Sequence, residues 1–191
     1  RTAKGCGLFF SGGVDSVHSL VQERDELTDL VFIHGFDIPL DDHARFAGAA
    51  AQVRRVAEGF GLGVIHVTTN LRSHPLLRPL KWRFEYGGAL AAVGHALSAE
   101  LGTVLLSSGS VGGRPAGNHP DLDPLWSSDR IGLVNVGDEV RRMDKTAMIA
   151  RNDVAMANLR VCWENASSDL NCGRCEKCLR TLIHLEVAGA R

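Results

Sequence analysis

Short, continuous apolar runs alternate with longer amphipathic stretches along the chain, a pattern typical of α/β proteins. The apolar runs predict five strands, at residues 5–11, 29–35, 63–68, 103–109 and 131–136. Helical spacing of apolar positions predicts helices at residues 14–25, 41–60, 84–101 and 179–185, with another opening at Met143. Because continuous apolar strands are typical of sheets buried on both faces, we expect a doubly wound, mainly parallel five-stranded sheet.

The turn after the first strand carries the clearest chemical signal. It reads Ser-Gly-Gly-Val-Asp-Ser, and we call it the Ser-Gly-Gly loop (residues 11–16). Two glycines allow a sharp turn with unobstructed N–H groups, which together with the next helix's first amides can cradle a phosphate. Ser11 and Ser16 can add hydroxyl donors, and Asp15 can hold a magnesium ion. A plain glycine turn is the alternative. His18, one turn farther on, is interpreted as a surface histidine, with an approach to a phosphate as its alternative.

The ends of two other strands supply further candidates for nucleotide contacts. Ligands of doubly wound sheets bind beyond the carboxyl ends of the strands, which points to His34, Gly35 and Phe36 at the end of the second strand. A plain strand-end turn is the alternative there. Ser108 and Gly109 end the fourth strand. We expect its tip beside the Ser-Gly-Gly loop, because the order of the sheet reverses between these two strands.

The connection over residues 110–126 is long for a compact domain, and such loops are usually functional or mobile. We take His119, Asp121 and Asp123 as candidates for substrate contacts. His119 and Asp121 are also candidates for the proton acceptor of a reaction. Residues 69–81, which contain two prolines, are expected to form a loop over the site.

Composition and charge narrow the function classes. The chain has 191 residues, 45% hydrophobic and 23% charged, enough for one sizeable core. Twenty-one basic and 22 acidic residues give a formal net charge of −1, which argues against broad electrostatic binding of nucleic acid. No apolar run approaches the roughly 20 residues that span a bilayer. Because the chain starts at Arg1 and has no signal-peptide pattern, we expect a trimmed or excised segment of a cytoplasmic protein.

Four of the five cysteines cluster near the C-terminus in the pattern C-x9-C-x2-C-x2-C. They are Cys162, Cys172, Cys175 and Cys178. In a reducing compartment such a cluster favours a metal over disulfides, and tight C-x2-C turns suit the four thiolates of tetrahedral zinc. We expect structural zinc, with an iron–sulfur cluster or redox or sulfur-carrying cysteines as alternatives. Cys6, on the first strand, is interpreted as a small buried residue.

No repeat, low-complexity stretch or linker divides the chain. We expect an α/β domain over residues 1–158, with the four-cysteine segment and final helix of residues 159–191 packed on the same domain. A metal in that segment would clip the final helix onto the core.

The Ser-Gly-Gly loop resembles the pyrophosphate loop of the ATP pyrophosphatase superfamily. Together with the cysteine pattern, it resembles 7-cyano-7-deazaguanine synthase-like proteins; the specific match covers residues 8–16 and 162–180. The resemblance implies a Rossmann-like fold of the adenine nucleotide alpha hydrolase type, and ATP, Mg²⁺ and Zn²⁺ as cofactors. It implies ATP contacts along the loop, at Ser11, Gly12, Gly13, Val14, Asp15 and Ser16.

The same resemblance implies catalytic roles for Asp15, Ser16 and Lys145. In many members of the superfamily a lysine at the start of a late helix reaches the ATP phosphates, and Lys145 matches that place. A solvated surface lysine is the alternative. The preceding residue, Asp144, is a candidate cap of that helix.

Two segments depart from the family. Residues 34–39 read His-Gly-Phe-Asp-Ile-Pro where the family carries a Tyr-Gly-Gln-Arg-His-like segment, and residues 109–126 are unlike a deazapurine pocket. We therefore expect a divergent branch that activates a different small molecule.

The expected activity is adenylation of a small-molecule carboxyl or carbonyl oxygen, with release of pyrophosphate, followed by attack of ammonia or an amine and release of AMP. An ATP-dependent sulfur transferase resembling tRNA thiolases and a non-catalytic ATP-binding regulatory module are the alternatives. The expected partners are ATP and a small-molecule substrate, and a homodimer is considered. Neither a membrane nor a nucleic acid is expected as a partner.

Overall fold

The computed structural model describes residues 4–77, 81–109, 117–165 and 169–190. These residues form one all-parallel sheet with the strand order β3-β2-β1-β4-β5. Its strands are β1 (Gly5–Phe9), β2 (Asp29–His34), β3 (Gly63–Thr68), β4 (Leu101–Ser107) and β5 (Gly132–Val136). The expected α/β class and the five-stranded parallel sheet are confirmed.

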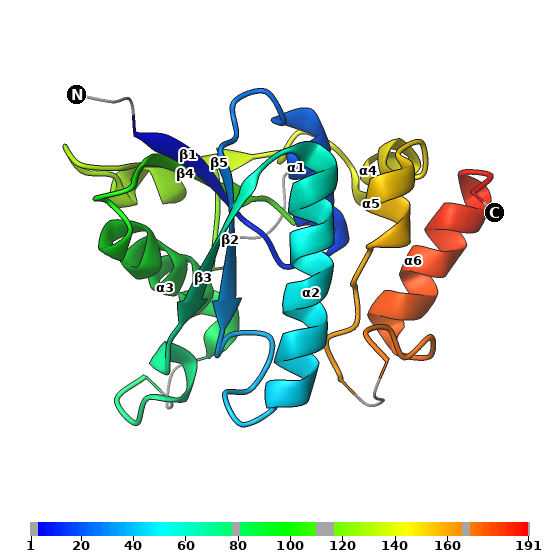
Figure 1. Cartoon of the computed structure of the whole chain (residues 1–191), viewed down its shortest axis with the longest axis horizontal. Helices are drawn as coiled ribbons and strands as arrows, with labels where there is room; N and C mark the ends of the chain where they lie inside the picture. The colour runs from blue at the N-terminus through cyan, green and yellow to red at the C-terminus, as the bar shows by residue number, and fades with distance from the viewer. Residues whose placement is uncertain (1–3, 78–80, 110–116, 166–168, 191) are drawn as a thin grey trace.

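Helices cover both faces of this sheet. The described α-helices are α1 (Val14–Gln22), α2 (His43–Phe60), α3 (Trp82–Ala96), α4 (Arg142–Ile149), α5 (Asp153–Ala157) and α6 (Glu176–Val187), and two 3₁₀ helices are η1 (Leu71–Ser73) and η2 (Asp123–Trp126). Figure 1 shows α1 and α2 on one face and α3 on the other, with α4, α5 and α6 on the same side as α1 and α2. The C-terminal helix α6 contacts α4.

The core consists of two apolar clusters, one on each face of the sheet. At the end of β1, Leu8 and Phe10 belong to the cluster beneath α1 and α2, whereas Phe9 belongs to the cluster beneath α3. This alternation follows from the two-residue period of a strand. A sheet that is apolar on both faces requires the continuous apolar runs seen in the sequence.

The order of the strands reverses beside β1. β2 and β3 follow on one side of it, and β4 and β5 on the other. The carboxyl ends of β1 and β4 therefore meet where open α/β sheets bind their ligands. The Ser-Gly-Gly loop begins just after β1. Ser108 follows β4, where its N–H donates to the Val136 carbonyl at 2.8 Å.

Local chemistry sets the ends of α2 and α3. Asp42 caps α2 by accepting a hydrogen bond from the Arg45 amide at 3.1 Å, and Gly61 ends the helix in the left-handed conformation. α3 ends more than one turn earlier than expected, because Leu101 already pairs with Gly5 in the sheet.

Two other helix starts also differ from expectation. The expected Asp144 cap is wrong, since the N-cap of α4 is Arg141, and Asp144 lies in the first turn and accepts a 2.8 Å hydrogen bond from the Arg141 guanidinium. α6 begins earlier than expected, at Glu176, because the sulfur of Cys175 caps it by accepting from the Cys178 amide at 3.5 Å.

The C-terminal segment packs on the face covered by α1 and α2. Cys162, Cys175 and Cys178 are buried in the apolar cluster of that face. Cys6 is half-buried rather than buried and packs against the same cluster, and burial raises the pKa of its thiol. Within the part of the chain that the structure describes, no helix combines the length and apolar character needed to cross a membrane.

Candidate ligand cavity and four-cysteine centre

The Ser-Gly-Gly loop forms a tight, hydrogen-bonded turn between β1 and α1. Gly12 has φ +80°, a conformation that favours glycine. The Ser16 hydroxyl donates to the Gly13 carbonyl at 3.1 Å, and the Ser11 hydroxyl accepts from the Gly13 amide at 3.3 Å. Gly13 is the N-cap of α1 and makes no side-chain cap. The loop therefore leads directly into the first-turn amides that a helix leaves without intrahelical partners.

Asp15 lies among cations contributed by α4. Arg142 donates to one carboxylate oxygen of Asp15 at 2.7 Å, and the Lys145 ammonium lies 3.6 Å from the other. Lys145 is only 1% exposed and donates a 2.7 Å hydrogen bond to the Ser108 carbonyl. Burial lowers the pKa of Lys145, while the charge of Asp15 opposes that shift. The structure thus brings together Asp15, Lys145 and Ser108, as expected, and adds Arg142, which sequence reasoning missed.

His18 is buried behind this group, so its interpretation as a surface histidine is wrong. It faces Lys145: a Cβ placed on Gly137 would lie 3.3 Å from the His18 ring and 3.4 Å from the Lys145 ammonium. Neither ring nitrogen has a hydrogen-bond partner among the described residues. Burial lowers the pKa of His18, and the Lys145 charge adds to the shift.

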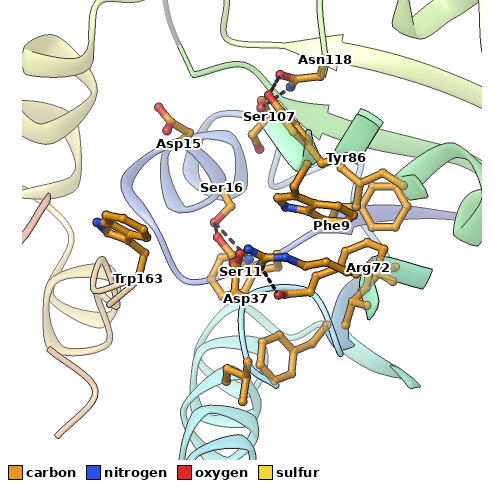
Figure 2. Close-up of a pocket in the computed structure, with 18 of the residues that line it drawn as sticks. Phe9, Ser11, Asp15, Ser16, Asp37, Arg72, Tyr86, Ser107, Asn118 and Trp163 are labelled. Atoms are coloured by element: carbon orange, nitrogen blue, oxygen red, sulfur yellow. Dashed lines mark hydrogen bonds between the residues drawn. The ribbon is translucent and has the colours of Figure 1, made fainter. Parts of the chain in front are cut away.

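A cavity of about 540 Å³ opens beside the loop. Its size lies within the range of ligand pockets, about 300–1,000 Å³. Ser11, Asp15 and Ser16 line one part of it. In Figure 2 these loop residues lie between Trp163 on one side and Tyr86 and Arg72 on the other. The remaining lining residues are Phe9, Phe10, Val31, Phe32, Ile33, Phe36, Asp37, Ile38, Trp82, Arg83, Leu90, Ser107, Asn118 and Lys177.

The part of the cavity away from the loop is aromatic and cationic. The Phe36 and Trp82 rings meet edge to face with centroids 4.8 Å apart, and the Arg72 guanidinium lies 5.0 Å from the centre of the Trp82 ring. Tyr86 donates to the side chain of Asn118. Such walls bind planar rings and anionic groups. Sequence reasoning missed this wall, although Trp82 and Tyr86 are four residues apart on α3, a spacing that puts two aromatic side chains on one helix face.

Of the three candidates at the carboxyl end of β2, Phe36 alone is among the described residues that line the cavity. The His34 ring is buried, lies 3.0 Å from the Pro39 carbonyl and stacks on Phe46 with centroids 4.0 Å apart. Gly35 has φ +105°, and a Cβ there would lie 1.9 Å from the Thr69 carbonyl oxygen. His34 and Gly35 therefore shape the turn rather than face a ligand.

The three candidates of the long connection, His119, Asp121 and Asp123, are also separate from the cavity, whose described lining does not include them. Asp123 is buried, accepts a 2.7 Å hydrogen bond from Asn135, and has its pKa raised by burial. Asp121 is 92% exposed, with His119 3.6 Å away. These positions do not support the expected substrate contacts, and Asn118 is the residue of this segment that reaches the cavity. Part of the connection, residues 110–116, lies outside the described residues.

The four C-terminal cysteines converge, as their spacing predicts. Their sulfur atoms all lie within 4.8 Å of one another, with 3.9 Å between Cys162 and Cys175 and 4.0 Å between Cys172 and Cys178. Zinc–thiolate bonds of about 2.3 Å at tetrahedral angles separate sulfurs by about 3.8 Å. The amides of Cys175 and Cys178 also donate to sulfurs of the group, at 3.3 and 3.5 Å. The cluster can hold a metal ion and is compatible with zinc.

The pKa values of Cys162 and Cys178 are shifted in opposite directions. Burial raises the pKa of Cys162, but hydrogen bonds from the backbone of Cys172 and Asn165 outweigh it and bring the pKa to about 6. Burial, and then the Cys175 side chain, raise the pKa of Cys178 to about 12. Four thiolates this close would repel one another. A metal cation bound between them offsets that repulsion and keeps the thiols deprotonated.

No protein-family model matches the chain, and neither does any curated protein sequence. The family resemblance therefore rests on residues 8–16 and 162–180. Function has to follow from the chemistry of the cavity and its loop.

Proposed function

We propose that this protein is an ATP-dependent enzyme of the ATP pyrophosphatase type. It adenylates the carboxyl or carbonyl oxygen of a small molecule, releases pyrophosphate, and forms an amide when ammonia or an amine displaces AMP. A nitrile would form where a second ATP adenylates the oxygen of a primary amide, and this adenylate then eliminates AMP with loss of both N–H protons. One observation carries the proposal: Ser-Gly-Gly-x-Asp-Ser turns from the central strand into α1 at the reversal of the sheet. Its Asp15 lines the cavity and is contacted by Arg142 and Lys145 of α4.

Charge and shape in the cavity support a nucleotide as ligand. Loop amides and the N-terminus of α1 favour phosphate, and Lys145, Arg142 and Lys177 supply positive charge near it. The aromatic wall at Phe36 and Trp82 suits a planar ring, of the nucleotide or of the acceptor.

The loop also fits a magnesium ion that arrives with the phosphates. One carboxylate oxygen of Asp15 is buried and, within the described chain, accepts no hydrogen bond. Together with the hydroxyls of Ser11 and Ser16 it offers the hard oxygen ligands that Mg²⁺ prefers, and Mg²⁺ takes its remaining ligands from phosphate and water. Bound there, the ion would neutralise charge on the departing pyrophosphate.

The reaction has two displacements. The acceptor oxygen attacks the α-phosphorus, the bond from that phosphorus to the bridging oxygen breaks, and pyrophosphate leaves with the electron pair. The nitrogen nucleophile then attacks the acceptor carbon, the bond to the AMP oxygen breaks, and the nitrogen loses a proton. Loop N–H groups and Lys145 stabilise the leaving pyrophosphate. Asp37, which lines the cavity, replaces His119 and Asp121 as candidate proton acceptor.

The four-cysteine centre has a structural role in this proposal. A zinc ion held by four thiolates has no open coordination position and supplies no chemistry to the substrate. Amide formation is therefore favoured over sulfur transfer, which needs a persulfide or a cluster.

The test combines binding and turnover. Calorimetry with Mg²⁺ and an ATP analogue that carries a methylene group between the α- and β-phosphates measures the nucleotide site. Turnover is measured with ATP, ammonium and a panel of ¹⁸O-labelled carboxylates, and adenylation transfers one ¹⁸O to AMP. Asp15→Asn should lower AMP formation by about 100-fold or more. The control Asp121→Asn alters an exposed residue away from the cavity and should retain activity.

The outcomes separate the candidate functions. AMP carrying ¹⁸O supports adenylation. Saturable nucleotide binding without AMP from any mixture would replace the proposal with a regulatory nucleotide-binding module. AMP formation that persists in Asp15→Asn within twofold would remove Asp15 from the mechanism. Brown protein with iron and labile sulfide would favour sulfur transfer.

A further inference from the structure

The four-cysteine segment supplies part of the cavity wall. Lys177 lies between Cys175 and Cys178, and Trp163 directly follows Cys162; both side chains line the cavity. In Figure 2, Trp163 stands beside the Ser-Gly-Gly loop. The cysteine centre is therefore adjacent to the ligand site, and its geometry bears on ligand binding.

Asn171 joins the two arms that carry the cysteines. Its side-chain oxygen accepts from the amides of Val161 and Cys162, at 2.8 and 3.2 Å, and its side-chain nitrogen donates to the Leu159 carbonyl at 2.7 Å. Asn171 immediately precedes Cys172. The Asn171 side chain thus links residues 159–162 to the segment that begins at Cys172.

Arg160, within residues 159–162, donates hydrogen bonds to backbone carbonyls of the Ser-Gly-Gly loop. Its amide donates to the Gly12 carbonyl at 2.8 Å, and its guanidinium donates to the Ser11 carbonyl at 3.2 Å. The side chain is buried, and two guanidinium nitrogens have no hydrogen-bond partner among the described residues. In a trans peptide the C=O and the next N–H point opposite ways. Arg160 therefore turns the N–H groups of Gly12 and Gly13 away from itself.

We infer that metal occupancy of the four-cysteine centre sets the conformation of the Ser-Gly-Gly loop, and through it the affinity for a phosphate-bearing ligand. A bound metal fixes the two cysteine arms, Asn171 holds residues 159–162 between them, and Arg160 orients the loop amides. Lys177 is fixed by the same cysteines as a further cation on the cavity wall. A contiguous hydrogen-bonded path of this kind can carry coupling between two sites, and the coupling is reciprocal.

Hydrogen exchange tests the loop directly. We compare peptides that cover residues 11–16 in protein with one Zn²⁺ per chain, in protein stripped by a chelator, and after Zn²⁺ is restored. The matched variant pair is Asn171→Ala and Asn70→Ala, both in excess Zn²⁺; Asn70 is exposed and makes no side-chain cap. The loop should exchange about fivefold faster in stripped protein and in Asn171→Ala. β3, at the far edge of the sheet, should be unchanged and serves as the folding control.

A second variant keeps the inference testable if Asn171→Ala loses its metal. Arg160→Gln leaves all four cysteines and the Asn171 clamp, and it should still speed exchange of the loop at full zinc content. The inference is overturned if loop exchange in stripped protein equals that of zinc-loaded protein. It is equally overturned if both variants, with zinc bound, protect the loop like the unaltered protein.

The ligand part of the inference rests on the proposed function and has its own readout. The affinity for Mg²⁺ with the ATP analogue, or with inorganic pyrophosphate, should fall at least about fivefold when zinc is removed. Equal affinities would overturn this part. If zinc-loaded protein binds neither probe, the proposed function fails, while hydrogen exchange still decides whether the metal orders the loop.

Discussion

The Arg142 guanidinium donates a 2.7 Å hydrogen bond to the carboxylate of Asp15, at the border of the cavity. The adjacent Arg141 makes a similar 2.8 Å bond to Asp144. The two pairs differ in solvent exposure. The Arg142 and Asp15 side chains are 19% and 23% exposed, whereas those of Arg141 and Asp144 are 73% and 47% exposed. Because water screens exposed ion pairs, these neighbouring arginines form a natural test of what shielding contributes.

We predict that Arg142→Met lowers the free energy of unfolding by about 1–3 kcal/mol, since it leaves the shielded carboxylate of Asp15 with one cation fewer. Arg141→Met should leave the free energy of unfolding unchanged within error. Urea denaturation of both variants measures the difference. Equal losses would mean that shielding of the Asp15 pair contributes nothing.

Gly35 should be intolerant of a side chain. Alanine there would have to adopt φ +105° and displace the Thr69 backbone, because its Cβ would lie 1.9 Å from that carbonyl oxygen. We predict that Gly35→Ala lowers the free energy of unfolding by about 3 kcal/mol. On α3, the described residues that a Cβ at Gly88 would meet reduce to the Trp126 ring, at 3.8 Å. Gly88→Ala should therefore be neutral or stabilising by up to about 1 kcal/mol, and a loss like that of Gly35→Ala would contradict the steric reasoning.

Much of the fold was predictable because the strands of a sheet that is buried on both faces have a simple sequence pattern, a short continuous apolar run. Runs such as residues 30–33 are apolar throughout, so the strands and their parallel pairing follow from pattern alone. Boundaries were less accurate where tertiary contacts decide them. Residue 101 has an apolar side chain that fits either a helix or a strand, and its pairing with Gly5 decides in favour of β4.

The candidate site was predictable only where neighbours in sequence form it. The Ser-Gly-Gly loop and the cysteine cluster are local patterns with a physical meaning. Arg72, Arg142 and Arg160 reach the loop or its cavity from distant segments, and a surface arginine has the same sequence pattern as a buried one. The burial of Asp123 depends equally on a distant partner, Asn135.

The four-cysteine centre should hold one zinc per chain in protein purified without oxygen, and that protein should be colourless. Cys172→Ser should lose the metal and unfold at a markedly lower temperature, because structural zinc contributes its binding energy to folding. Cys6→Ser is the matched control, since Cys6 lies on β1 outside the cluster, and it should keep its zinc. Elemental analysis with thermal denaturation measures both effects. Zinc retained in full by Cys172→Ser would contradict the four-thiolate assignment.

His18 should make the protein less stable in mild acid. Its folded-state pKa is lowered, first by burial and then by the Lys145 charge, although Glu139 and Asp15 act in the opposite direction. The unfolded chain therefore takes up a proton near pH 6.5 that the folded protein resists. Stability is then full above that pH and falls, as pH drops below it, by up to about 1.4 kcal/mol per unit.

We predict that His18→Asn has a smaller loss of unfolding free energy between pH 7.5 and 5.5 than the unaltered protein, measured by urea denaturation in excess zinc. Some dependence should remain, since burial also lowers the pKa of His66. His43, exposed at the start of α2, provides the control, and His43→Asn should keep the full dependence. The buried ring can accept a proton only at the expense of its packing beside Lys145. If His18→Asn and the unaltered protein lose the same free energy over this range, the titration of His18 is not coupled to folding.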